Sequence, residues 1–114
     1  MTEDEAEALS EMIYAMQSCA SATCTAVGFA MPDVSYVYYD DNWDCDYYDE
    51  GCEGEYDGDQ TAYVSRGGSG GTGADAWYEA STAMHEAIHY AFGTDEEGTL
   101  AIESACEEEI QWWG

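Results

Sequence analysis

Two histidines and a glutamate lie close together in the chain, at a spacing that could bind a metal ion and activate water on it. They are His85, Glu86 and His89, in the order H-E-x-x-H, and the chain has no other histidine. On an α-helix, positions i and i+4 lie on the same face, so both imidazoles can reach one ion. Glu86 can then contact a water molecule bound to that ion. The pattern therefore predicts a zinc site with an adjacent general base.

The residues around this motif predict that it lies on one long helix. Residues 74–92 have helical periodicity, with Asp75 as a candidate N-cap and Gly93 as a candidate stop. The apolar positions at helical spacing, which should face the core, are Trp77, Met84, Ile88 and Ala91. The two histidines lie beside this stripe. We therefore expect one face of the helix in the core and the adjoining face in a groove.

A second helix is expected directly after the first. The pattern Thr94-x-x-Glu97 is typical of a capping box and predicts a helix that continues to about Trp113. Its apolar positions are Leu100, Ile102, Cys106, Ile110 and Trp113. To bury this stripe, the second helix must fold back against the first.

The third ligand of a zinc ion is expected from this second helix. A catalytic zinc commonly takes three protein ligands and leaves a fourth position for water. Glu103 lies beside the apolar stripe and is the predicted third ligand. Glu107 and Glu108 are the reserve candidates. Glu96 and its neighbour Glu97 are interpreted as helix-start residues instead.

Such a site predicts peptide-bond hydrolysis. Bound zinc would lower the pKa of its water towards ~7 and polarise the scissile carbonyl. Glu86 would accept the proton of the water and pass it to the leaving amine. Candidate oxyanion donors are Tyr78, Tyr90 and Arg66. The substrate would be a peptide or protein, which could pair with an edge strand near Tyr63.

A resemblance to a known family follows from these residues. Met84-His85-Glu86-Ala87-Ile88-His89, followed by a glycine, a capped helix and an inward glutamate, resembles a minimal gluzincin-type (minigluzincin-like) zinc metallopeptidase domain. Similar domains occur in phage and haloarchaeal virus proteins. The resemblance covers roughly residues 61–113 and implies His85 and His89 as zinc ligands and Glu86 as general base. Glu103 matches the third ligand by arrangement only, because its spacing is shorter than in thermolysin-like enzymes.

The rest of the chain predicts an α+β fold in a single zincin-like domain, residues 1–114. Residues 2–17 form a candidate helix that opens with the capping box Thr2-x-x-Glu5, and residues 18–26 are expected to be a loop. Alternating residues predict a strand at 34–39, and the short run of β-favouring residues at 61–65 predicts a second one. Between them lies an acidic excursion rich in Cys, Tyr and Gly, at about 40–60.

Two motif matches in the middle of the chain are rejected. The oxygen spacing that starts at Asp40 resembles a calcium loop, but Cys45 and Gly51 stand where an EF-hand needs glycine and glutamate. A less regular cation site among these carboxylates remains open. The glycines at 67–73 match a dinucleotide fingerprint, but the chain is too short and too acidic for that fold. We expect this segment to be a flexible loop that flanks the cleft.

The charge of the chain is strongly negative. Asp and Glu number 26 against one Lys or Arg, which gives a net charge of −25. Such self-repulsion is screened in molar salt, where the Debye length is about 3 Å, so the composition favours a halophilic protein. It excludes direct nucleic-acid binding through phosphates. The acidic N-terminus does not resemble a signal peptide, and no apolar run is long enough for a membrane span. A halophile cytoplasm or a virion is the expected location.

The five cysteines are at spacings that do not match a zinc knuckle or ribbon. Two alternatives remain open: one or two disulfides that bracket the middle segment, or small buried thiols.

Three functions are therefore compatible with the sequence. The first is a small zinc metallopeptidase. The second is a zinc-stabilised structural or assembly protein of a haloarchaeal virus particle, with other virion or assembly proteins as partners. The third is an acidic inhibitor that mimics DNA.

Overall fold

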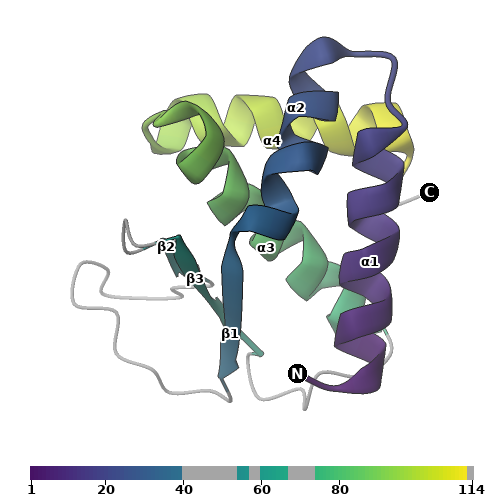
Figure 1. The fold of residues 1–114 in the computed structure, drawn as a ribbon, viewed down its shortest axis with the longest axis vertical. Coiled ribbons are helices and arrows are strands. Elements are labelled where there is room, and N and C mark those ends of the chain that lie inside the picture. The colour runs from purple at the N-terminus through teal and green to yellow at the C-terminus, as the bar shows by residue number, and fades with distance from the viewer. Residues whose placement is uncertain (40–53, 57–59, 67–73, 113–114) are drawn as a thin grey trace.

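The structure is a computed structural model that describes residues 1–39, 54–56, 60–66 and 74–112. These residues form helices on one side and a small sheet on the other (Figure 1), so the predicted α+β class is confirmed. In chain order the elements are α1 (Glu3–Gln17), α2 (Ala22–Ala30), a 3-10 turn (Met31–Asp33), β1 (Ser35–Tyr39), β2 (Gly54–Tyr56), β3 (Thr61–Ser65), α3 (Ala74–Phe92) and α4 (Glu96–Ile110). Three predictions concern residues 40–53 and 67–73, which lie outside the described residues. They are the cation site, most of the acidic excursion and the loop beside the cleft.

The first helix begins as its sequence predicts. The Thr2 hydroxyl accepts a hydrogen bond from the Glu5 amide at 3.1 Å, and the Glu5 carboxylate accepts one from the Thr2 amide at 2.7 Å. This reciprocal pair is a capping box. Leu9, Met12 and Met16 on the inner face of α1 are buried. This face of α1 therefore forms part of the core.

Helix α2 (Ala22–Ala30) begins within residues 18–26, the segment that we expected to be a loop, and this expectation was wrong. Ser21 caps the helix by accepting a hydrogen bond from the Cys24 amide at 3.3 Å. The helix packs so closely on α1 that a Cβ on Gly28 would lie 2.5 Å from the Gln17 backbone nitrogen. Only glycine fits this crossing. Close packing against α1 therefore accounts for a helix that local patterning does not reveal.

The sheet has the strand order β1-β3-β2, with β1 parallel and β2 antiparallel to β3. The strands predicted at 34–39 and 61–65 are confirmed. Because β3 is central, Tyr63 already has strand neighbours on both sides: its register partners are Val37 and Glu55. Edge pairing of a peptide near Tyr63 is thus ruled out in this sheet.

Helix α3 is the centre of the molecule (Figure 1). Its bounds are the predicted ones, and every residue from Glu79 to Ile88 is buried. The sheet packs on one side of α3, while α1, α2 and α4 surround the others. The expected core position of Trp77 is wrong: this residue is 39% exposed and its ring lies 4.4 Å from that of Trp112, centroid to centroid.

Helix α4 differs from the prediction at both ends. Its N-cap is Asp95, whose side chain accepts a hydrogen bond from the Gly98 amide at 2.8 Å, and the helix ends at Ile110. Its inner face is also more polar than expected, because Thr99 is fully buried whereas Leu100 is 48% exposed. No helix among the described residues combines the length and the apolar character needed to cross a bilayer.

One disulfide joins two of the helices. It links Cys24 of α2 to Cys106 of α4, and both residues are buried. The two cysteines are 82 residues apart, so the bridge brackets the middle segment, as one of the two alternatives predicted. Cys45 and Cys52 lie outside the described residues, and Cys19 has a free thiol.

Candidate metal centre

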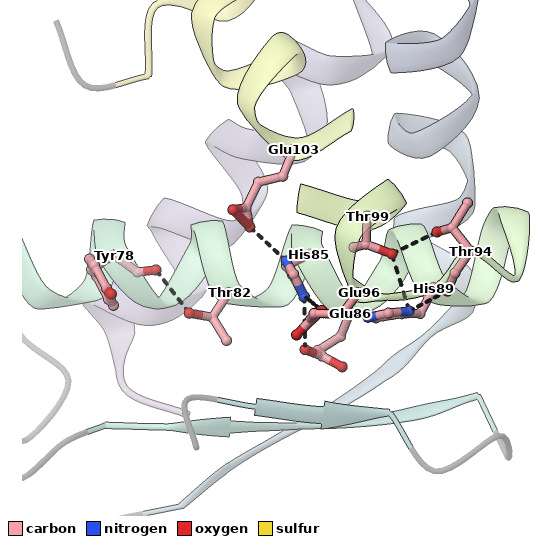
Figure 2. A network of polar contacts seen from close by, with 9 residues as sticks. All are labelled: Tyr78, Thr82, His85, Glu86, His89, Thr94, Glu96, Thr99 and Glu103. Carbon is pink, nitrogen blue, oxygen red and sulfur yellow. Dashed lines mark hydrogen bonds and ion pairs between the residues drawn. The ribbon is translucent and has the colours of Figure 1, made fainter. Parts of the chain in front are cut away.

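The two motif histidines point their Nε2 atoms at a single carboxylate oxygen (Figure 2). Glu96 Oε1 lies 2.6 Å from His85 Nε2 and 3.1 Å from His89 Nε2. One ligand atom from each of the three residues falls within 4.8 Å of the other two. Two imidazoles at i and i+4 and one carboxylate therefore converge on one point. These separations are those of hydrogen bonds, so the Glu96 carboxylate would have to move back for an ion with bonds of about 2.0–2.2 Å to lie between the three ligand atoms.

The other ring nitrogen of each histidine faces an acceptor. His85 Nδ1 lies 3.0 Å from Glu103 Oε1, and His89 Nδ1 lies 2.9 Å from the Thr94 carbonyl oxygen. A carbonyl can only accept, so His89 carries its proton on Nδ1 and leaves the Nε2 lone pair for an ion. The ionised carboxylate of Glu103 favours the same tautomer in His85. Zinc-bound histidines usually have this second contact, which fixes the ring and raises its basicity.

Glu103, the predicted third ligand, lies on the Nδ1 side of His85 rather than at the point where the two Nε2 atoms converge. Glu96, which we interpreted as a helix-start residue, is at that point and is also the first residue of α4. The reason is the tight connection between the helices. Gly93 has φ +62°, and its amide donates to the His89 carbonyl at 2.8 Å. This left-handed turn ends α3 and brings the start of α4 back beside His89.

The two reserve candidates are not at this point either. Glu107 accepts a hydrogen bond from the Ser81 hydroxyl, further back along α3, and Glu108 is exposed. A useful signal was present in the sequence, since Glu96 follows the stop glycine by three residues. It was not decisive, because a glutamate in the first turn of a helix is also favoured by the helix dipole.

These contacts form a polar ladder between the two helices. On α3 its members are Ser81, His85 and His89, spaced four residues apart, and on α4 they are Thr99, Glu103 and Glu107, also four apart. Because α4 runs back along α3, each residue of one row meets its counterpart in the other. Thr99 lies 3.2 Å from His89 Nδ1 and 2.6 Å from the Thr94 hydroxyl. The ladder therefore fixes the orientation of both histidine rings.

Glu86 is placed as a general base should be. Its Oε2 lies 3.9 Å from His85 Nε2, and the residue is 6% exposed. Burial raises the pKa of Glu86 to about 7, although the charges of the two histidines oppose this shift. A carboxyl group with a pKa near neutrality can both accept and return a proton at physiological pH.

The three carboxylates around His85 favour a positive charge between them. Burial alone would lower the pKa of His85, but the hydrogen bond and charge of Glu103 outweigh it, and Glu86 and Glu96 add to that effect. Together they raise the pKa of His85 to about 9. Without an ion, a proton on His85 supplies the positive charge. A divalent cation at Nε2 would replace that proton, and the donor set fits zinc.

The site reaches the protein surface at its carboxylate side. The side chain of Glu96 is 54% exposed, that of His89 23%, and that of His85 11%. Figure 2 shows Glu86 and Glu96 on the side of α3 that faces the sheet. An ion held by the three ligands would therefore have one partly open side.

Comparison with known proteins gives no family assignment. No family model, no curated protein and no solved structure matches the chain. The functional interpretation therefore depends on the motif and on the geometry of the site.

Of the three candidate oxyanion donors, Arg66 is already engaged elsewhere. Its Nε and Nη2 donate to the two carboxylate oxygens of Glu5 at 2.7 and 2.8 Å, in a bidentate pair. The Tyr90 hydroxyl accepts from Gln60 Nε2 at 2.7 Å, which links the residue after His89 to the start of β3. Tyr78 is 49% exposed. The two tyrosines remain as candidates.

Proposed function

We propose that this chain is a small zinc-dependent metallopeptidase adapted to high salt. The observation that carries the proposal is the approach of His85 Nε2 and His89 Nε2 to one oxygen of Glu96, with buried Glu86 beside them. We infer that His85, His89 and Glu96 are the protein ligands. The resemblance to minigluzincin-like domains supports the same function.

Zinc in such a site lowers the pKa of a bound water to about 7 and polarises a carbonyl oxygen. The protein residues supply the rest. Glu86 accepts the proton from the water and donates it to the leaving amine. Glu103 and the Thr94 carbonyl hold the two imidazoles in the tautomer that presents Nε2. Glu103 thus acts as a positioning residue in this proposal.

The number of ligands favours catalysis. Structural zinc sites usually have four protein ligands and no open position, whereas catalytic sites have three and a water. Here the possible ligands are His85, His89 and Glu96, and Glu86 is the general base of the H-E-x-x-H motif in this proposal.

A second candidate function is a zinc-stabilised structural or assembly protein. The observation that favours it is the polar ladder, since an ion at its end would tie α3 to α4 in a small domain. In this case Glu86 has no catalytic role.

Replacing Glu86 with glutamine separates the two functions. The experiment measures zinc content and cleavage of a quenched-fluorescence peptide library, both in molar KCl. The peptidase proposal predicts that Glu86→Gln keeps zinc but loses cleavage by at least about 100-fold, since a general base contributes 10²–10⁴-fold. Glu97→Gln, an exposed neighbour of the site, is the matched control and should retain both. A wild-type protein that holds zinc but cleaves no peptide would favour the structural role.

A further inference from the structure

A second group of metal-binding side chains lies away from the histidines, where the end of α1, the start of α2 and the last turns of α4 meet. Cys19 Sγ, Cys24 Sγ and a carboxylate oxygen of Glu109 lie within 4.8 Å of one another. Cys106 Sγ lies beside this group, since it is bonded to Cys24. Two sulfurs and one carboxylate thus lie close together, with a third sulfur next to them.

The backbone holds two of these side chains in place. Glu109 Oε2 accepts hydrogen bonds from the Ala20 amide at 2.8 Å and the Ser21 amide at 3.1 Å. The Cys19 thiol donates to the Ala15 carbonyl at 3.5 Å. Glu109 is exposed and Cys19 is half-buried, whereas the disulfide is buried. An ion could therefore enter from the Glu109 side and meet the sulfurs behind it.

We propose that Cys19, Cys24, Cys106 and Glu109 bind a second zinc ion when the Cys24–Cys106 disulfide is reduced. This site is independent of the peptidase proposal and shares no residue with the histidine centre. Three thiolates and a carboxylate form a four-ligand set of the kind that structural zinc sites use.

The geometry is compatible with a tetrahedral ion. With Zn–S bonds of about 2.3 Å, the sulfurs of a tetrahedral site lie about 3.8 Å apart. The separation within the present cluster is at most 4.8 Å for Cys19, Cys24 and Glu109. The two sulfurs of the disulfide must move apart after reduction, as any two non-bonded sulfurs do. Cys106 must also turn its side chain towards Cys19 and Glu109, whereas Cys19, Cys24 and Glu109 need shifts of only about 1 Å.

The chemistry balances with a dithiol reductant. The reductant cleaves the Cys24–Cys106 bond by thiol–disulfide exchange. It is itself oxidised to a cyclic disulfide and leaves thiols on Cys24 and Cys106. Zinc then binds three thiolates, and three protons are released. The released protons come from the thiols, because a thiol that coordinates a divalent cation is deprotonated.

The test counts zinc ions in the full chain, with Cys45→Ser and Cys52→Ser as background so that only the three described cysteines contribute thiols. One sample is reduced with a dithiol, which is then removed under nitrogen, and a second sample is left oxidised. Both samples are then equilibrated with Zn²⁺. We expect one more zinc per chain in the reduced protein than in the oxidised one. Co²⁺ in place of Zn²⁺ should give a thiolate-to-cobalt charge-transfer band in the reduced protein only.

Three variants in this background test the ligand assignment. Cys19→Ser and Glu109→Gln should each remove the additional zinc or weaken its binding at least about 10-fold, whereas Glu108→Gln, an exposed neighbour, should leave it unchanged. His85→Ala should remove zinc from the histidine centre and keep the additional ion. If the reduced protein unfolds, zinc should restore its helical circular dichroism.

Three results would overturn the proposal. The first is an equal zinc content in the reduced and oxidised proteins. The second is an additional zinc that persists at full affinity in Cys19→Ser and Glu109→Gln. The third is a reduced protein that unfolds and does not regain helicity with zinc.

Discussion

His85 and Glu96 are eleven residues apart in the chain and belong to different helices, yet His85 Nε2 and Glu96 Oε1 are separated by 2.6 Å. The turn at Gly93 makes this contact possible by reversing the chain between the helices. Because His89 Nε2 lies 3.1 Å from the same oxygen, the contact defines a point with three possible ligand atoms. The exposed side of Glu96 leaves that point accessible.

Glu96 and Glu103 should affect zinc binding to different extents. In our proposal Glu96→Gln removes a ligand and weakens zinc binding by more than about 100-fold, whereas Glu103→Gln removes an outer contact and weakens it by about 10- to 100-fold. Competition with a chromophoric chelator measures both affinities, and Glu97→Gln serves as control. A larger loss in Glu103→Gln than in Glu96→Gln would instead make Glu103 the third ligand, as the sequence alone suggested.

Thr99 should act on the histidine centre through His89. Its hydroxyl lies 3.2 Å from His89 Nδ1, and the residue is fully buried. Thr99→Val keeps the shape but removes the hydroxyl, so we expect zinc affinity to fall by several-fold while the helical circular dichroism is retained. Thr99→Ser, which keeps the hydroxyl, should recover most of the affinity. Equal affinities in Thr99→Val and Thr99→Ser would contradict this role.

Arg66, the only Lys or Arg of the chain, should matter for stability in acid. Burial by itself would raise the pKa of Glu5, but hydrogen bonds with Arg66, Glu79 and Thr2 and the charge of Arg66 lower it to about 2. A lowered carboxyl pKa adds stability above the unfolded value of 4.5, and this stability is lost as the pH falls from 4.5 towards 2. The contribution at neutral pH is at most about 3 kcal/mol.

Denaturant unfolding of the wild type and of Glu5→Gln between pH 7 and pH 2 measures this contribution. The difference in unfolding free energy between the two proteins should be largest above pH 4.5 and should shrink towards pH 2, where the wild-type carboxyl takes up its proton. Glu7→Gln, on the exposed face of the same helix, is the control and should show little difference at any pH. A difference between the wild type and Glu5→Gln that stays constant down to pH 2 would be inconsistent with the ion pair.

Removal of salt should destabilise the protein. With a net charge of −25, repulsion between carboxylates grows as the Debye length increases from about 3 Å at 1 M salt to about 30 Å at 0.01 M. We therefore expect Tm to fall on dilution from molar to millimolar KCl. The triple variant Glu3→Gln, Glu7→Gln, Glu11→Gln, all exposed on α1, should show a smaller fall. A wild-type Tm that is unchanged or higher in low salt would argue against a halophilic protein.

The elements that could be predicted from the sequence are those with strong local patterns, such as a capping box or a regular periodicity. The capping box at Thr2 and the long periodic stretch of α3 predicted helices with correct bounds, and alternation predicted β1. Helix α2 was missed because it has only nine residues, too few for a stable isolated helix, and owes its stability to the close crossing at Gly28. Such tertiary packing leaves no periodic trace in the sequence.

The same distinction applies to the site. The histidine pair could be predicted because i and i+4 positions of a helix must share a face. The approach of Glu96 to both Nε2 atoms could not be predicted, because Glu96 and Glu103 are seven residues apart and so lie on the same face of α4. Which of the two glutamates reaches the Nε2 atoms depends on how the chain turns at Gly93. The sequence does not specify the backbone angles of that turn.

A crystal structure of the zinc-loaded protein, with anomalous scattering recorded on both sides of the zinc absorption edge, tests the central claim most directly. The proposal predicts an ion with His85 Nε2, His89 Nε2 and a Glu96 oxygen at about 2.0–2.2 Å and a water within reach of Glu86. An ion bound elsewhere in a crystal whose His85 and His89 bind none, or histidine side chains that point apart, would contradict it.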